Sequence, residues 1–287
     1  MIIRILLIAM VWCVAYPAYA LEDIPPAVPA PVVKSQPLPL PAPKQKHPPT
    51  APIKTKNPAP SKVFKAAPLP ASAPTAIKGK GFYVLELFSS QACTFCPRAD
   101  AMMATYAAQP SMIALSCHID YFDVKEGSLA LPLCSVRQKS YELTLDIGPK
   151  YTPQMVVNGQ YDAVGYLPKE IAAAFAKVRS APVSPLNVEA LVGGLYRAKL
   201  PDVAADKYSI WLFVYDAPHS VLVKDGGNAG KRLTYYNVVS KAGFLGSWDG
   251  KAKDLKFDAK LDPQAKGFAL LVQSTTNNAI ILAAKVE

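Results

Sequence analysis

Histidine is scarce in this chain of 287 residues, which contains only His47, His118 and His219. Hydrolases of the Ser-His-Asp or Cys-His type need a histidine beside the nucleophile, and none of these three indicates that arrangement. The N-terminal apolar run, residues 5–14, is also shorter than the 20 or so residues of a membrane-spanning helix. The sequence therefore favours neither such a hydrolase nor a confident membrane span.

The folded part of the chain has little net charge. Residues 21–80 hold nine lysines against two acidic residues, whereas residues 81–287 hold 21 basic and 19 acidic side chains, so most of the formal charge of +10 lies before residue 81. Nucleic-acid binding needs a basic face on the folded domain. We therefore expect no nucleic-acid partner.

The glycine-rich segment 226–232 does not form a nucleotide-binding loop. The spacing from Gly227 to Lys231 is wrong, and Arg232 stands where a Ser or Thr would hold magnesium. The segment is predicted to be a tight surface loop.

Residues 1–20 have the pattern of an export signal. Arg4 precedes the apolar run, and Ala18-Tyr19-Ala20 fits the small-residue site of signal peptidase. Removal of this segment takes Cys13 with it and leaves four cysteines, which suggests an oxidising compartment. We expect a periplasmic or secreted protein, tethered to the membrane if the signal is not cleaved.

Residues 21–80 are predicted to be a spacer. Sixteen of the 28 prolines lie between Ile24 and Pro74, together with Ala, Lys and Val. Such a composition cannot bury a core and favours extended polyproline II structure. The spacer is either simply disordered, or its lysines also contact anionic lipid headgroups or the cell envelope.

Cys93-Thr94-Phe95-Cys96 follows an apolar run, residues 83–88, and precedes a helix-like stretch that opens at Pro97. The dipole and free N–H groups at a helix start favour a thiolate. We predict that Cys93 is a reactive cysteine and that Cys96 can close a disulfide with it, which is the chemistry of a thiol–disulfide exchanger. The alternative is a static disulfide, of the kind that exported domains use for stability.

Residues 81–181 alternate between strand and helix patterns. Short apolar runs predict strands, and an Ala-rich stretch predicts the helix between the first two. Asn158-Gly159 between apolar runs predicts a hairpin turn. The expected strands are residues 84–88, 112–116, 154–157 and 161–164, and the expected helices are residues 98–108, 136–145 and 168–178.

Residues 182–287 are expected to form a second, smaller domain that is mostly β and sandwich-like, because helix signals are few there. The expected strands are residues 188–191, 209–215, 233–239, 254–257, 268–273 and 280–285.

Residues 81–181 as a whole resemble the thioredoxin fold, which implies an α/β domain with a cis proline at Pro153 beside the thiols. The resemblance also implies that Cys93 is the exposed nucleophile and Cys96 the buried resolving thiol, and that Thr152 and Pro153 bind substrate. The alternative for Pro153 is an ordinary trans proline at the entry to an edge strand. From residue 82 onward the chain is similar to an exported bacterial thioredoxin-like family catalogued as a domain of unknown function, family 1223. The similarity is carried by residues 84–91 (VLELFSSQ), 93–100 (CTFCPRAD), 118–123 (HIDYFD), 151–157 (YTPQMVV), 228–235 (NAGKRLTY) and 237–239 (NVV).

Cys117 ends a predicted strand, and Cys134 opens the helix that follows the next loop. A disulfide between them would close a loop of about 17 residues, and this structural bridge is the favoured interpretation. The alternative is a second redox pair that relays electrons to Cys93 and Cys96.

His118 and Asp120 lie at the carboxyl end of that same strand, where reacting groups gather in open α/β sheets. They are candidate accessory residues for proton transfer, or, with cysteine sulfur, for binding Cu(I) or Zn(II). The favoured interpretation is a hydrogen-bonded strand end without a metal, because a zinc site needs its ligands in tighter pairs.

The sequence thus predicts an exported thiol–disulfide oxidoreductase that needs no cofactor. Its substrates would be proteins or small thiols, and a redox partner would recycle it. The alternatives are a non-catalytic envelope binding module with a structural disulfide, and a copper- or zinc-handling protein of the same fold.

Overall fold

The computed structural model describes residues 81–122 and 127–287. The predicted signal (1–20) and spacer (21–80) lie outside these residues. Within the described ranges no helix is long and apolar enough to cross a membrane.

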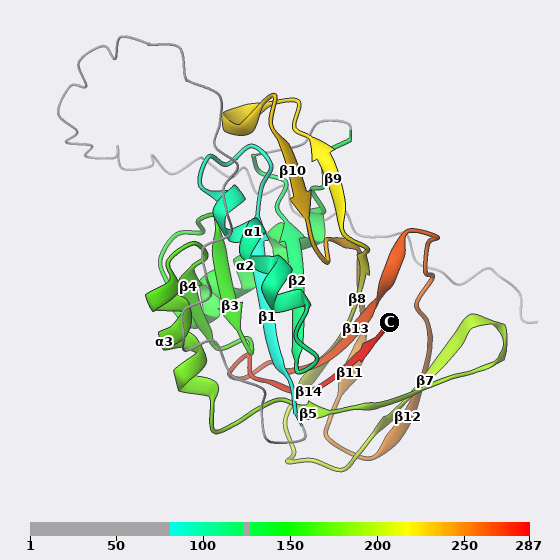
Figure 1. Ribbon diagram of the computed structural model, residues 1–287. Coiled ribbons are helices and arrows are strands. Elements are labelled where there is room, and N and C mark those ends of the chain that lie inside the picture. The colour runs from blue at the N-terminus through cyan, green and yellow to red at the C-terminus, as the bar shows by residue number, and fades with distance from the viewer. Residues whose placement is uncertain (1–80, 123–126) are drawn as a thin grey trace, which may run out of the picture. The chain divides into compact units, whose positions relative to one another are not determined.

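The first part of the described chain is a βαβ unit extended into a four-stranded sheet of mixed direction (Figure 1). The strand order is β2-β1-β3-β4, with β1 and β2 parallel and β3 antiparallel to both of its neighbours. The predicted elements of this part are all present. Their bounds are β1 Tyr83–Ser89, α1 Cys96–Ala107, β2 Met112–His118, α2 Pro132–Leu145, β3 Gln154–Val157, β4 Tyr161–Val164 and α3 Pro168–Val178.

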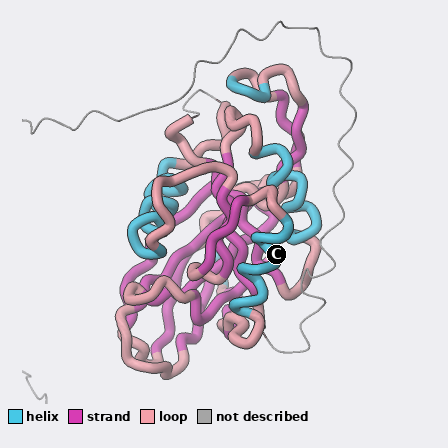
Figure 2. Tube along the Cα trace, turned by 90° about the vertical axis from the view of Figure 1, so that its left-hand side faces the viewer, coloured by secondary structure: helices cyan, strands magenta, loops and turns pink. Residues whose placement is uncertain are grey.

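Helices cover both faces of this sheet (Figure 2). Side chains alternate along a strand, so Leu85 and Leu87 of β1 pack in one cluster with residues of α1 and α3. Val84 and Phe88 point the other way and pack with Tyr141 of α2. Burial on both sides explains why β1 is a continuous apolar run instead of an alternating one.

The rest of the chain is largely β and contains several sheets. One sheet has the order β11-β8-β13-β14-β5, another the order β12-β7-β6, and β9 and β10 form a separate hairpin. The bounds are β5 Ser184–Pro185, β6 Asn187–Ala190, β7 Leu195–Leu200, β8 Tyr208–Asp216, β9 His219–Leu222, β10 Arg232–Tyr235, β11 Val239–Trp248, β12 Lys253–Asp258, β13 Ala265–Ser274 and β14 Ile280–Val286.

The central strands β8 and β13 of the five-stranded sheet are largely buried on both faces. Phe213 of β8 and Leu271 of β13 belong to the cluster that includes α2. Leu212 and Leu270, one residue before each, face a second cluster that contains Phe257 of β12. The first of these clusters therefore joins the segments before and after residue 182 in a shared core.

The strand expected at residues 233–239 is wrong in its extent, because β10 ends at Tyr235 and β11 begins at Val239. Asn237, between them, has a left-handed backbone with φ of 49°. The side-chain amide of Asn237 donates to the Ala114 carbonyl over 2.9 Å, and the backbone carbonyl of Asn237 accepts from the Ser116 N–H over 2.9 Å. The chain thus leaves the hairpin to cover the edge of β2.

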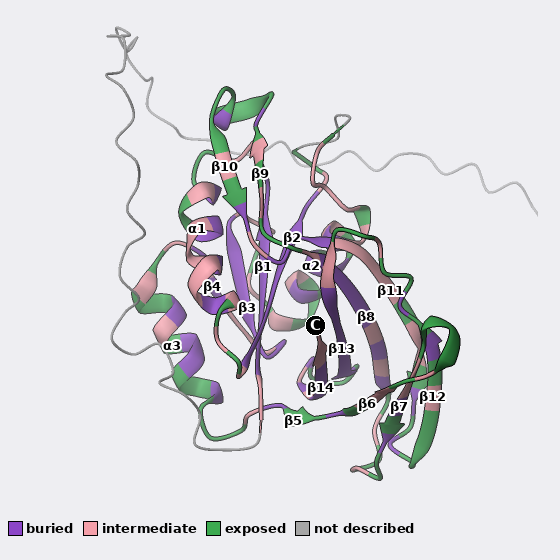
Figure 3. Ribbon diagram, turned by 45° about the vertical axis from the view of Figure 1, so that its right-hand side comes forward, coloured by how far each residue is buried: buried purple, intermediate pink, exposed green. Residues whose placement is uncertain are grey.

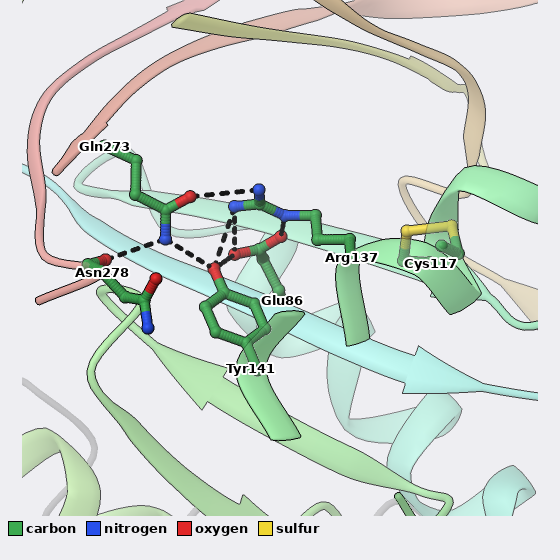
Figure 4. A network of polar contacts seen from close by, with 7 residues as sticks. Glu86, Cys117, Arg137, Tyr141, Gln273 and Asn278 are labelled. Atoms are coloured by element: carbon green, nitrogen blue, oxygen red, sulfur yellow. Dashed lines mark hydrogen bonds and ion pairs between the residues drawn. A yellow bond between two sulfur atoms is a disulfide. The ribbon is translucent and has the colours of Figure 1, made fainter. Parts of the chain in front are cut away.

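A buried ion pair joins β1 to α2, and hydrogen bonds connect it to β13 (Figure 4). Arg137 of α2 contacts both carboxylate oxygens of Glu86, and it donates to the Gln273 amide oxygen over 3.1 Å. The Tyr141 hydroxyl donates to Glu86 over 2.5 Å and accepts from Gln273 over 3.1 Å. The network satisfies two buried charges and connects the α/β sheet to the β region.

Cys117 and Cys134 form a disulfide that joins the end of β2 to the start of α2, 17 residues apart in sequence. Closing such a loop stabilises a fold by about 3 kcal/mol in the chain-entropy model. We expect Cys117→Ala/Cys134→Ala to lower the free energy of unfolding by at least this amount in non-reducing urea titrations. Under a strong reductant the gap between wild type and variant should shrink to the packing loss alone. A loss below 1 kcal/mol without reductant would contradict a stabilising bridge.

Candidate redox site

Cys93 lies in the loop between β1 and α1, and Cys96 lies at the start of α1. The backbone turns twice before the helix begins, since the Cys93 N–H donates to the Ser90 carbonyl over 3.2 Å and the Cys96 N–H to the Cys93 carbonyl over 3.2 Å. Cys96 is the first residue of α1 and is buried, whereas Cys93 is partly exposed, and neither forms a disulfide. One sulfur is thus accessible and the other shielded.

The surroundings favour a thiolate at Cys93. A hydrogen bond from Cys96 is the largest influence on the pKa of the Cys93 thiol, and burial opposes it. Thr152 and the backbone N–H groups of Phe95 and Cys96 lower it further, so that the pKa falls from 9.0 to about 5. Burial, the same hydrogen bond and Asp100 raise the pKa of Cys96 far above its ordinary range. The two thiols therefore differ in the way that an attacking and a resolving thiol differ.

Asp100 lies in α1, about one helical turn after Cys96, and is buried. Burial raises its pKa to about 8, although Ser89 donates a hydrogen bond to its Oδ1 over 2.8 Å. The carboxyl group is consequently protonated at neutral pH. It does not oppose a thiolate at Cys93 as an ionised carboxylate would.

The Thr152-Pro153 peptide bond is cis and immediately precedes β3. The Thr152 carbonyl lies 3.6 Å from the Cys93 sulfur, and the Pro153 carbonyl accepts from the Gly165 N–H over 2.8 Å. The structure thus brings Cys93, Cys96 and Thr152 together.

A pocket of about 510 Å³ opens beside Cys93. Its wall includes two aromatic side chains that are more than half exposed, Phe95 at 56 % and Phe122 at 57 %. Phe95 stacks on Tyr166, with ring centroids 5.7 Å apart. Lys150, also in the wall, holds its ammonium 4.3 Å from the centre of the Tyr121 ring. The pocket offers apolar surface and one cation next to the accessible sulfur.

His118 and Asp120 are not placed with the thiols by any contact among the described residues. His118 is 1 % exposed, its ring packs edge-on against Tyr235 at 5.1 Å, and burial, followed by His219, lowers its pKa to about 3. It is therefore neutral at physiological pH. Asp120 accepts a hydrogen bond from Ser135 near the start of α2.

The described residues contain no group of three or more His, Cys, Asp or Glu side chains that could hold a metal ion. Cys117 and Cys134 are joined to each other, so within residues 81–122 and 127–287 the four cysteines do not form one ligand set.

Sequence reasoning missed one part of the site. The segment 226–232 was expected to be a surface loop, but Asn228 is fully buried and donates to the Cys93 carbonyl over 2.7 Å. The Gly-Gly-Asn order was the available signal, since paired glycines mark a close approach of two backbones as well as a turn.

The element order, the Cys-x-x-Cys pair at the start of α1 and the cis proline before β3 are those of a thioredoxin-like fold. The chain belongs to the family described as protein of unknown function (DUF1223), whose model matches residues 84–273. None of the curated proteins matches the sequence.

Two solved structures share the fold. Protein AGR_C_4864 from Agrobacterium tumefaciens is 24 % identical, with a TM-score of 0.60, over 71 % of this chain and 93 % of its own. HBP35 of Porphyromonas gingivalis is 15 % identical, with a TM-score of 0.51, over 72 % of this chain and 75 % of its own.

Proposed function

We propose that this protein is an exported thiol–disulfide oxidoreductase, with a thioredoxin-like domain that carries the thiols and a sandwich-like β region that follows it. The observation that carries the proposal is the partly exposed Cys93 sulfur, which lies beside the buried Cys96 thiol at the start of α1 and beside the cis Thr152-Pro153 bond. Hydrogen bonds from Cys96 and from backbone N–H groups lower the pKa of Cys93 to about 5. An inert structural thiol has no need of such stabilisation, since buried cysteines in apolar surroundings have raised pKa values.

The reaction has two exchanges. The Cys93 thiolate attacks one sulfur of a substrate disulfide, forms a mixed disulfide and releases the other substrate sulfur as a thiolate. Cys96 then loses its proton and attacks the Cys93 sulfur, which closes the Cys93–Cys96 disulfide and releases the second substrate thiolate. Two electrons pass from the protein to the substrate, and the reverse sequence oxidises a dithiol. Thr152 and Pro153 are proposed to hold the substrate segment beside Cys93.

The substrate is proposed to be a protein or a small thiol whose apolar neighbours enter the pocket between Phe95 and Phe122. Export to the periplasm or beyond rests on the signal-like residues 1–20 and fits the Cys117–Cys134 disulfide, because such bridges persist in oxidising compartments. Recycling requires a partner with a dithiol or disulfide of its own.

The test is an insulin-disulfide reduction assay on the mature chain. Cys93→Ser is expected to reduce turnover at least a hundredfold, because a hydroxyl cannot replace the thiolate in the exchange. Cys96→Ser should instead accumulate a mixed disulfide at Cys93, visible by mass spectrometry without reductant.

The control is Cys117→Ala/Cys134→Ala, which removes the two sulfurs of the structural disulfide, leaves Cys93 and Cys96 in place and should retain turnover. Equal turnover in wild type and Cys93→Ser would overturn the catalytic proposal and favour the binding-module alternative.

A further inference from the structure

The hairpin of β9 and β10 reaches the loop that carries Cys93 (Figure 1). Among the described strands, β9 and β10 pair only with each other, and most of their residues are exposed or half-buried (Figure 3). The turn between them contains a short 3₁₀ segment, Gly226–Asn228. The Gly227 N–H donates to the Ala92 carbonyl over 2.9 Å, so the turn is bonded to the backbone one residue before Cys93.

The turn fits against this loop only because two of its residues are glycines. A Cβ atom on Gly226 would lie 2.5 Å from Cβ of Ala92, and one on Gly227 would lie 2.2 Å from Oγ1 of Thr94. Gly226 also has a φ of 71°, which side chains disfavour. The two backbones are therefore in direct contact.

Asn228 makes the central contact and is 0 % exposed. Its side-chain Nδ2 donates to the Cys93 carbonyl over 2.7 Å and to the Gln91 carbonyl over 3.0 Å. The Lys231 ammonium donates to its Oδ1 over 2.9 Å. Since an ammonium can only donate, Lys231 fixes which end of the amide faces the Cys93 loop.

The Cys93 carbonyl is thus held from two sides, because it also accepts the Cys96 N–H. Its direction sets the plane of the peptide that follows Cys93, and so governs how the N–H groups of Phe95 and Cys96 meet the Cys93 sulfur. Those N–H groups are among the causes that lower the pKa of Cys93. A side chain 135 residues further along the chain can therefore act on the nucleophile without touching its sulfur.

We propose that Asn228, carried by the β9–β10 hairpin, is a positioning residue that holds the Cys93 loop in its thiolate-stabilising conformation. The proposal rests on the redox function proposed above. It gives part of the β region a role at the thiols: the hairpin completes the site from outside the α/β sheet.

The experiment measures the alkylation of Cys93 by iodoacetamide between pH 4 and 9 in the full mature chain. Asn228→Ala should raise the pH of the alkylation midpoint. The shift corresponds to a fall of about fivefold in the ionisation constant of the Cys93 thiol, the factor equivalent to about 1 kcal/mol for one net hydrogen bond. Asn228→Asp should lower it more, because a carboxylate cannot donate to the two carbonyls and its charge disfavours a thiolate. The control is Ser220→Ala, which removes a side-chain contact to Thr234 elsewhere on the same hairpin and should leave the profile unchanged.

A second pair of variants tests the same contact if Asn228→Ala does not fold. Gly227→Ala places a methyl group against Thr94 Oγ1 and should raise the alkylation midpoint, and adding Thr94→Ala should restore most of the wild-type profile. Profiles of Asn228→Ala and Asn228→Asp that superimpose on wild type would overturn the proposal, as would a Gly227→Ala profile that Thr94→Ala does not restore. This readout is independent of turnover, so an inactive wild type would refute the redox function while a shifted profile still supported the positioning role.

Discussion

Cys93 in the folded, reduced protein is expected to react with iodoacetamide along a pH profile whose midpoint lies near pH 5. Below this pH the sulfur is protonated and slow, and above it the thiolate reacts. At pH 5 about half of Cys93 is ionised, whereas a thiol at the ordinary value of 9.0 is ionised to roughly one part in ten thousand.

The expected rate gain is smaller than that ratio. Nucleophilicity falls with pKa, with a Brønsted slope of about 0.4–0.5, so a drop of four units costs roughly 60-fold. The net gain over the same cysteine in urea-unfolded chain is therefore on the order of 100-fold at pH 5, and the two rates become similar near pH 7. The midpoint, with the alkylated residue mapped by mass spectrometry, is consequently the better measurement.

Cys96→Ala provides the control, because the hydrogen bond from Cys96 is the largest cause of the lowered pKa. Its midpoint should move to higher pH while Cys93 remains exposed. A wild-type midpoint at pH 8 or above would contradict the thiolate. If the midpoint is near 5, the reduced pair is stabilised, which makes the Cys93–Cys96 couple more oxidising than one with an ordinary thiol.

The α/β part of the fold could be predicted from sequence because its signals are local. Gln154–Val157, Tyr161–Val164 and Pro168–Val178 have the predicted bounds. Asn158 and Gly159 have the positive φ angles, 49° and 73°, that a tight hairpin turn requires. Helix α3 begins with a proline in its first turn, which is a reliable start signal.

The β region was less predictable, and β5, β7, β9 and β11 were missed. Strand β11 contains Gly243 and Gly246, which read as turn residues in sequence. Pairing with β8 overrides that preference and accommodates two register shifts along the strand. Strand β9 is only four residues long and alternates between half-buried and exposed positions, so it has no apolar run to detect.

The candidate site divides in the same way. Cys93 and Cys96 could be predicted because their spacing and the following Pro97 are contiguous in sequence. The role of Asn228 could not be predicted, because its hydrogen bond to the Cys93 loop depends on where the β9–β10 hairpin, which lies between β8 and β11 in the chain, is placed in the fold. Periodicity and turn chemistry describe neighbours in sequence, and this contact joins residues 135 positions apart.

Arg137→Met is expected to lower the free energy of unfolding by about 3–5 kcal/mol, because it leaves the Glu86 carboxylate buried without its counter-charge. The guanidinium also packs over the Phe213 and Trp211 rings, at 5.0 Å and 5.5 Å, so a side chain of similar length keeps most of the packing. The measurement is urea unfolding followed by tryptophan fluorescence, for which Trp211 is a local reporter, and by far-ultraviolet circular dichroism.

The double variant Glu86→Leu/Arg137→Met separates charge from packing. Replacing both partners of a buried ion pair with apolar residues removes the unpaired charge, so the double variant should regain more than half of the loss. Tyr141 then keeps its hydrogen bond from Gln273, which is why recovery is not expected to be complete. A loss below 1 kcal/mol for Arg137→Met, or a double variant less stable than Arg137→Met, would show that the ion pair does not stabilise the fold in this way.

The wild type should unfold in one transition by both optical probes, because Glu86, Arg137 and Gln273 join β1 and α2 to β13.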